Sequence, residues 1–95
     1  MGVARMNISI ENMTSNNGNK VANQFVIDIG DGVRWFRSYN SNIARIDADG
    51  NVTLDATYWD YSATTSKYRN LFLGNDTATC KRLIKSGVYR LGDLN

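Results

Sequence analysis

The hydrophobic pattern changes its period once along the chain, near Asp60, and this change restricts the fold. Before Asp60, apolar residues alternate with polar ones in "NISIENM" (7–13), "NQFVIDIG" (23–30) and "GVRWFRSY" (32–39). Alternation of this kind is typical of half-buried β-strands. After Asp60, apolar residues recur three and four positions apart, as on one face of a helix. The sequence therefore predicts strands first and helices second, which is an α+β fold.

Short polar segments separate the predicted strands. The glycine-containing "GDG" at 30–32 and "DADGN" at 47–51 are typical of tight hairpins, the second of them joining strands at 43–46 and 52–54. A longer polar segment at 14–20 is expected to be the loop of the first hairpin. We therefore expect an antiparallel meander of about five strands.

Two short helices are predicted after the strands. Ser62 and Asp76 are good N-cap residues, and Gly74 and Gly87 follow the two periodic segments where a left-handed C-terminal residue is common. We expect a positive φ at one or both glycines. The remaining residues, 88–94, are predicted to form a short strand or extended arm.

The same periodicity predicts which side chains face the core. On the first helix, Lys67, Arg69 and Asn70 are expected to point away from an apolar face formed by Thr64, Tyr68, Leu71 and Phe72. On the second helix, Lys81, Arg82 and Lys85 are expected on the polar side. Ten side chains are predicted to be largely buried: Phe25, Ile27, Ile29, Trp35, Leu54, Tyr68, Leu71, Phe72, Leu83 and Ile84.

Length and composition fit one small domain. The 95 residues, 42% of them hydrophobic, predict a single α+β domain over residues 1–95. The first ten residues have no apolar run of signal-peptide length, and no window approaches the 18 or so apolar residues needed to span a bilayer. We therefore expect a cytoplasmic protein that does not contact the membrane.

Motifs for catalysis or metal binding are missing from the sequence. The chain has no histidine and one cysteine, Cys80, which is expected to be a buried packing residue. The segment 47–51 differs from a calcium loop, because the glycine and the bidentate glutamate that such a loop needs are not at the required positions. We expect no catalytic residue, no metal site, no cofactor and no enzymatic activity.

Charge and aromatic residues concentrate around the start of the helical part. Residues 1–60 carry a net charge of −2, whereas residues 61–92 carry +5. The aromatic cluster of Tyr58, Trp59 and Tyr61 precedes the basic segment. Either it closes the open end of a small core, or it forms a recognition surface. The candidate binding residues are Tyr58, Trp59, Tyr61, Lys67, Arg69, Lys81, Arg82 and Lys85.

Three segments of the sequence resemble a known protein family. "GNKVANQF" (18–25), "YWDYSATTSKYRNLFLG" (58–74) and "KSGVYRLGDLN" (85–95) are similar to a family of small uncharacterised proteins encoded by tailed phages and mobile elements. The family has no assigned activity, so no functional residue comes with the resemblance. What it implies is a small accessory protein that acts by binding, including binding that blocks a bacterial immune factor or a toxin.

Two functions from different classes follow. The first is a non-catalytic protein that binds and inhibits or modulates a host protein, with the aromatic cluster as an interface anchor. The alternative is binding of RNA or single-stranded DNA by the basic helical segment, with the aromatic residues stacking on bases. The oligomeric state stays open in both, and a homodimer is compatible with either.

Overall fold

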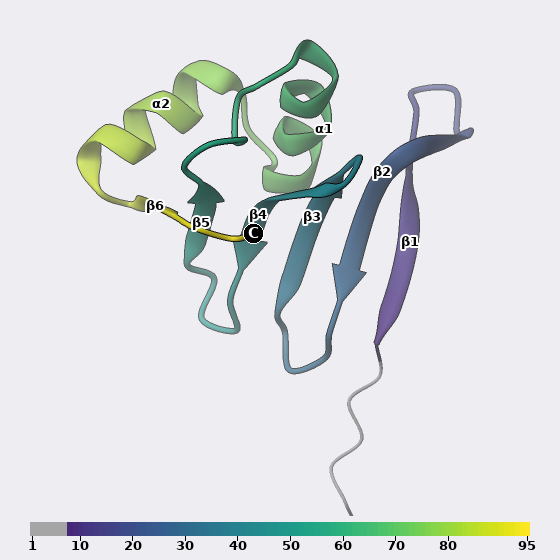
Figure 1. Cartoon of the computed structure of the whole chain (residues 1–95), viewed down its shortest axis with the longest axis horizontal. Coiled ribbons are helices and arrows are strands. Elements are labelled where there is room, and N and C mark those ends of the chain that lie inside the picture. Colours follow the sequence, from purple (N-terminus) through teal and green to yellow (C-terminus); the bar gives the residue numbers. More distant parts are fainter. Residues whose placement is uncertain (1–7) are drawn as a thin grey trace, which may run out of the picture.

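A computed structural model describes residues 8–95 as one six-stranded sheet with two helices (Figure 1). The elements in chain order are β1 (Ser9–Thr14), β2 (Lys20–Asp28), β3 (Arg34–Ser38), β4 (Ser41–Ile46), β5 (Val52–Asp55), α1 (Ala63–Leu73), α2 (Thr77–Ser86) and β6 (Tyr89–Gly92). The predicted α+β class is confirmed. The predictions for the first strand, the chain start and the domain extent also include residues 1–7. These seven residues lie outside the described part of the chain.

The predicted meander is confirmed by the strand order β1-β2-β3-β4-β5-β6, in which β1 to β5 pair antiparallel. The turn at 30–32 has three consecutive residues with positive φ, and it closes with a hydrogen bond from Ile29 N to Val33 O of 3.2 Å. The turn at 47–51 closes in the same way, with Asp47 N donating to Asn51 O over 3.0 Å. Both hairpins lie where the glycines predict them.

The C-terminal segment adds a sixth strand. β6 pairs parallel to β5, so that α1 and α2 form the crossover between two neighbouring parallel strands. After β6 the chain returns across the end of the sheet, where Leu94 N donates to Asp55 Oδ1 over 2.9 Å and Asn95 exchanges hydrogen bonds with Asn42. The predicted extended arm is therefore an edge strand followed by an anchored tail.

Local signals set both ends of each helix. The Ser62 side chain accepts a hydrogen bond from Thr65 N over 3.1 Å, and the Asp76 carboxylate accepts one from Thr79 N over 2.7 Å. Gly74 has φ of 73° and Gly87 has φ of 83°. The expectation of positive φ is thus confirmed at both glycines. Within residues 8–95, neither helix is long and apolar enough to cross a membrane.

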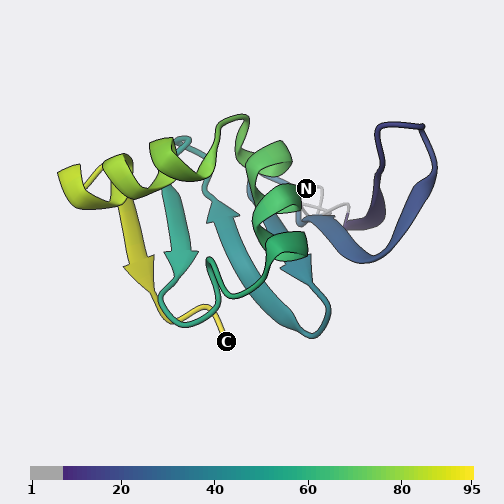
Figure 2. The ribbon, with the colours of Figure 1, turned by 90° about the horizontal axis from the view of Figure 1, so that it is seen from above.

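Both helices lie on the same face of the sheet (Figure 2). α1 packs on β2, β3 and β4, and α2 packs on β6. The Phe36 and Phe72 rings stack across this interface with centroids 5.8 Å apart. The buried core between helices and sheet consists of Phe36, Ile43, Ala44, Val52, Leu54, Tyr68 and Phe72.

Part of the predicted core is wrong. Leu54, Tyr68 and Phe72 are buried as predicted, and so is Cys80. Leu71 is 52% exposed, because α1 turns it toward β1, where no helix covers the sheet. The other six predicted core residues are only half-buried: Phe25, Ile27, Ile29, Trp35, Leu83 and Ile84.

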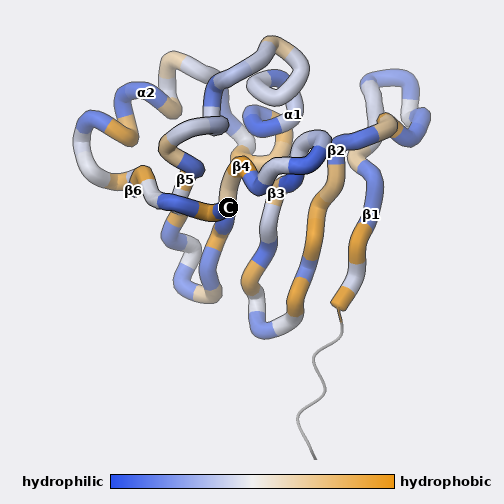
Figure 3. The backbone as a smooth tube through the Cα atoms, in the orientation of Figure 1, coloured by the Kyte–Doolittle hydropathy of each residue, from blue (hydrophilic) through white to orange (hydrophobic). Residues whose placement is uncertain are grey.

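Three of these half-buried residues lie on strands whose alternation is predicted correctly but whose face is not. Phe25, Ile27 and Trp35 belong to the face opposite the helices, since their neighbours Val26 and Phe36 contact the core. Figure 3 shows the hydrophobic colour continuing along β2 and β1, beyond the part of the sheet under the helices. Alternation defines two faces, but it does not say which one the helices will cover.

Candidate binding site

The aromatic loop, residues 56–62, is anchored at its start by Asp55. This carboxylate is buried at the end of β5, and its Oδ2 accepts hydrogen bonds from Thr57 N over 3.1 Å and Tyr58 N over 2.9 Å. Burial raises the pKa of Asp55, but these bonds and the one from Leu94 N outweigh burial and hold the pKa below its usual 3.8. An ionised Asp55 therefore ties the loop and the C-terminal tail to the same point at neutral pH.

Arg69 is the second anchor of the aromatic loop. Its guanidinium is fully buried, with Nη1 donating to Trp59 O over 2.6 Å and Nη2 donating to Thr77 Oγ1 over 2.8 Å. It also lies 5.0 Å from the centroid of the Trp59 ring and forms an ion pair of 3.2 Å with Asp60. One arginine thus joins the loop, α1 and the start of α2.

This burial corrects the expectation that Arg69 points away from the core and belongs to an exposed binding surface. The side chain follows Tyr68 on α1 and lies under the aromatic loop, which immediately precedes α1 and folds back over it. Helical periodicity describes only the helix, so it could not reveal a loop that covers the supposedly polar side.

The ion pair is present in its charged form at neutral pH. Burial raises the pKa of Asp60, but a 2.6 Å hydrogen bond from Ser66 Oγ and the neighbouring Arg69 together hold that pKa below 3.8. The positive charge of Lys81 also lowers it.

The aromatic cluster has one member packed against the core and two exposed members. Trp59 is half-buried and packs against the core, so it closes this end of the fold. Tyr58 and Tyr61 remain exposed, with their rings nearly perpendicular and their centroids 5.6 Å apart. The two tyrosines are therefore available for recognition, whereas Trp59 is largely structural.

The four other predicted basic residues are exposed. Lys67 lies on α1 with its Nζ 5.4 Å from the Tyr68 ring centroid, while Lys81, Arg82 and Lys85 lie on α2. Within residues 8–95, Arg69 and Asp60 form the one ion pair, so these four side chains have no acidic partner there. They are spread over two helices, and Arg69 does not join them.

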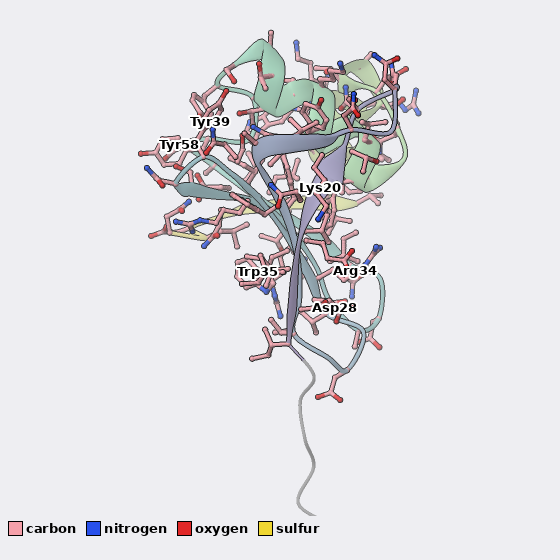
Figure 4. The ribbon with its side chains drawn as sticks, turned by 90° about the vertical axis from the view of Figure 1, so that its right-hand side faces the viewer. Lys20, Asp28, Arg34, Trp35, Tyr39 and Tyr58 are labelled. Carbon is pink, nitrogen blue, oxygen red and sulfur yellow. The ribbon has the colours of Figure 1, made fainter. Side chains whose placement is uncertain are left out.

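Sequence reasoning missed the face of the sheet that the helices leave uncovered, called the open face below. Residues paired directly across strands share a face. One row across the sheet consists of Ile10, Ile27, Trp35, Arg45, Thr53 and Arg90, and the next row consists of Asn12, Phe25 and Arg37. In Figure 4, Trp35 projects from this side, whereas Asp28 and Arg34 project from the opposite side.

The open face combines apolar and basic side chains. The Arg45 guanidinium lies 5.6 Å from the centroid of the Trp35 ring, and Arg37 donates to Asn42 Oδ1 over 2.9 Å. Of the acidic residues in the six strands, Glu11 and Asp28 belong to the helix-covered face, and Asp55 is buried. The charge that the strands present on the open face is thus positive.

Tyr39 extends this surface at the β3–β4 turn. It is exposed, and Figure 4 places it on the same side of the sheet as Trp35 and Tyr58. Its φ of 55° is unusual for a residue with a large side chain, and its N–H donates to Asn23 O over 2.6 Å. This turn is hard to recognise from the sequence, because "YN" lacks the glycine that normally marks a two-residue hairpin.

A signal for the open face was present in the sequence. β2 and β3 carry large apolar residues on both faces, Val26 and Phe36 on one and Ile27 and Trp35 on the other. A strand that is apolar on both faces is typical of a sheet covered on both sides. Here the helices cover one side only, so the other side stays uncovered by them.

Comparison with known proteins identifies a family without assigning a function. No group of three His, Cys, Asp or Glu side chains in residues 8–95 is arranged to hold a metal ion. No curated protein matches the chain, and no solved structure matches it. Residues 8–86 match a protein-family model described as a family of unknown function (DUF8033), and the chain therefore belongs to this family.

Proposed function

We propose that this protein is a small non-catalytic binding protein that recognises another protein through the open face of its sheet. The observation that carries the proposal is the uncovered surface itself. Trp35 and Ile10 lie on it with Arg45 and Arg90, and Tyr39 and Tyr58 lie on the same side of the molecule. A contiguous exposed apolar surface on a small domain usually marks an interaction site.

The composition of the open face fits a protein interface. Interface centres are enriched in aromatic residues and arginine, and Trp, Tyr and Arg are the side chains whose truncation costs most. Six strands spaced by about 4.8 Å make the face roughly 24 Å wide. The two tyrosine-bearing loops extend this surface at one end of the sheet.

The resemblance to proteins of tailed phages and mobile elements supports a more specific form of the proposal. In this form the protein is a phage accessory protein that acts in the host cytoplasm. Its partner is then a host protein, such as an immune factor or a toxin, which it inhibits or modulates by covering a functional surface.

The test starts with capture of partners from host lysate by the tagged protein, with and without nuclease. The dissociation constant of the purified partner is then measured for the wild type, Trp35→Ala and Tyr58→Ala. We expect each substitution to weaken binding by about tenfold or more, as for interface hot spots. Lys85→Ala, on the far side of the molecule, is the matched control and should leave the affinity unchanged.

Thermal unfolding of each variant checks that the fold survives, since Trp35 is half-buried. Folded Trp35→Ala and Tyr58→Ala proteins that bind the partner as tightly as the wild type would refute the open face as the recognition surface. Loss of the captured band after nuclease treatment would favour the alternative, in which nucleic acid binds the exposed basic residues of α1 and α2.

A further inference from the structure

We propose that β1 pairs with β1 of a second copy of this chain, antiparallel about a twofold axis, so that one sheet runs through a homodimer. This inference goes beyond the proposed function and does not depend on it. The axis is perpendicular to the sheet, so the open faces of both copies stay on the same side and remain accessible.

β1 has a free edge. The strand lies at one end of the sheet order and pairs only with β2 among residues 8–95 (Figure 1). α1 packs mainly on β2, β3 and β4, and its Leu71 only lines an open hollow beside β1. The outer backbone N–H and C=O groups of such a strand are a template for another strand. Ser9–Thr14 contains no proline or lysine; Glu11 and the irregular backbone between Asn12 and Thr14 are its features that oppose pairing.

The opposite edge of the sheet is different. β6 is four residues long, is packed by α2 and carries the exposed Arg90 in its middle. Short edge strands with a charged side chain and a covering helix are the usual protection against edge pairing. The two edges therefore differ, and β1, which is longer and has no helix packed along it, is the less protected one.

Exposed isoleucines lie along the unprotected edge. Ile8 is 64% exposed and Ile10 is 65% exposed, and as alternate residues they point to the same face of the sheet. Antiparallel pairing brings side chains that are directly opposite to within about 5 Å of each other. A second copy of the strand would therefore place its own isoleucine directly opposite Ile10 and cover this part of the edge.

Symmetry restricts the register. Residues that lie opposite each other must share a face of the sheet. The twofold axis therefore has to lie between one residue of β1 and the same residue of the second copy, and it is named below by that residue. An axis through Glu11 would oppose two carboxylates, and an axis through Asn12 would involve the irregular backbone between Asn12 and Thr14. An axis through Ile10 pairs Ile10 with Ile10 of the second copy and places Ser9 opposite Glu11. We therefore assign the axis to Ile10.

Analytical ultracentrifugation of the full chain over a wide concentration range tests the dimer. We expect the wild type to approach twice the monomer mass of 10.6 kDa. Ile10→Glu should raise the dimer dissociation constant by at least about tenfold, because it opposes two carboxylates and removes the isoleucine pair. The control is Val88→Glu, which changes an apolar residue of similar exposure, 61%, away from β1 and should dimerise as the wild type does.

Cysteine cross-linking tests the register. Ile10→Cys should form an intermolecular disulfide under mild oxidation, because position 10 faces itself across the axis. Asn12→Cys should form little, since it faces Ile8 of the second copy, and the wild type should form none because Cys80 is buried. A wild type that is monomeric at every concentration, a dimer unaffected by Ile10→Glu, or cross-linking at position 12 in preference to position 10 would each overturn the proposal.

Discussion

Arg69 shows how one residue can carry the connection between two parts of the fold. The sequence predicts Arg69 as part of an exposed basic binding surface. In the structure it lies at the centre of a buried polar network. Its guanidinium contacts Trp59, Asp60, Asn70 and Thr77. The planar group with five donors suits this position, and a lysine could not make the same set of hydrogen bonds.

Arg69→Met should therefore destabilise the protein strongly. The substitution removes the guanidinium from the Trp59 carbonyl and leaves Asp60 with Ser66 Oγ but without its counter-charge. Breaking a buried pair typically costs about 3–5 kcal/mol. Because the Asp60 side chain is 33% exposed and can be hydrated, we expect a loss in the free energy of unfolding near 3 kcal/mol, at the lower end of that range. Urea denaturation measures the change.

The exposed neighbour Lys67 provides the control for this prediction. Lys67→Met makes the same kind of charge-to-apolar change on the same helix, and it should alter the free energy of unfolding by no more than about 0.5 kcal/mol. Equal stabilities of the Arg69→Met and Lys67→Met proteins would show that the network around Arg69 contributes nothing to the fold.

At the scale of the elements, local features were predictable and faces were not. Ser62, Asp76, Gly74 and Gly87 act within four residues of themselves, so their pattern is sufficient to place both helix ends. The face of α1 depends on its contacts with the sheet, which is distant in sequence, and with the aromatic loop, whose path over the helix no helical pattern describes. The periodicity therefore predicts Leu71 in the core, although it lines an open hollow beside β1.

Adjacent residues on α1 should respond very differently to truncation. Phe72 stacks on Phe36 in the core, so Phe72→Ala should lower the free energy of unfolding by about 3–5 kcal/mol. Leu71 is mostly solvent-exposed, so Leu71→Ala should lower it by less than about 1 kcal/mol. Thermal or urea unfolding of both variants measures the difference, and a comparable loss in each would mean that the face of α1 is misassigned.

At the scale of the whole molecule, the candidate site was predictable only in part. Tyr58 and Tyr61 were found because an aromatic cluster is visible in the sequence and a loop residue is usually at the surface. The open face was missed because it depends on where the crossover from β5 to β6 places the helices. Had α1 and α2 crossed on the other side, Trp35 would be in the core and Phe36 would face the solvent.

Charge is also distributed over the whole molecule rather than concentrated in one groove. Lys81, Arg82 and Lys85 lie on α2 on one side of the sheet, whereas Arg45 and Arg90 lie on the opposite face. Tight binding of single-stranded nucleic acid needs a continuous basic track beside aromatic platforms. With a net charge of +2 divided between two sides, the molecule lacks the focused field of such a track.

We therefore expect weak binding to single-stranded RNA and DNA, with dissociation constants no better than the roughly 10⁻⁴ to 10⁻⁶ M of non-specific contact at physiological salt. Fluorescence anisotropy with labelled oligonucleotides over a series of salt concentrations measures this. The triple variant Lys81→Ala, Arg82→Ala, Lys85→Ala should differ little from the wild type. Tight binding by the wild type, with a log–log salt slope that falls by about 2 to 3 in the triple variant, would contradict the expectation, because each lost phosphate contact removes nearly one unit of slope.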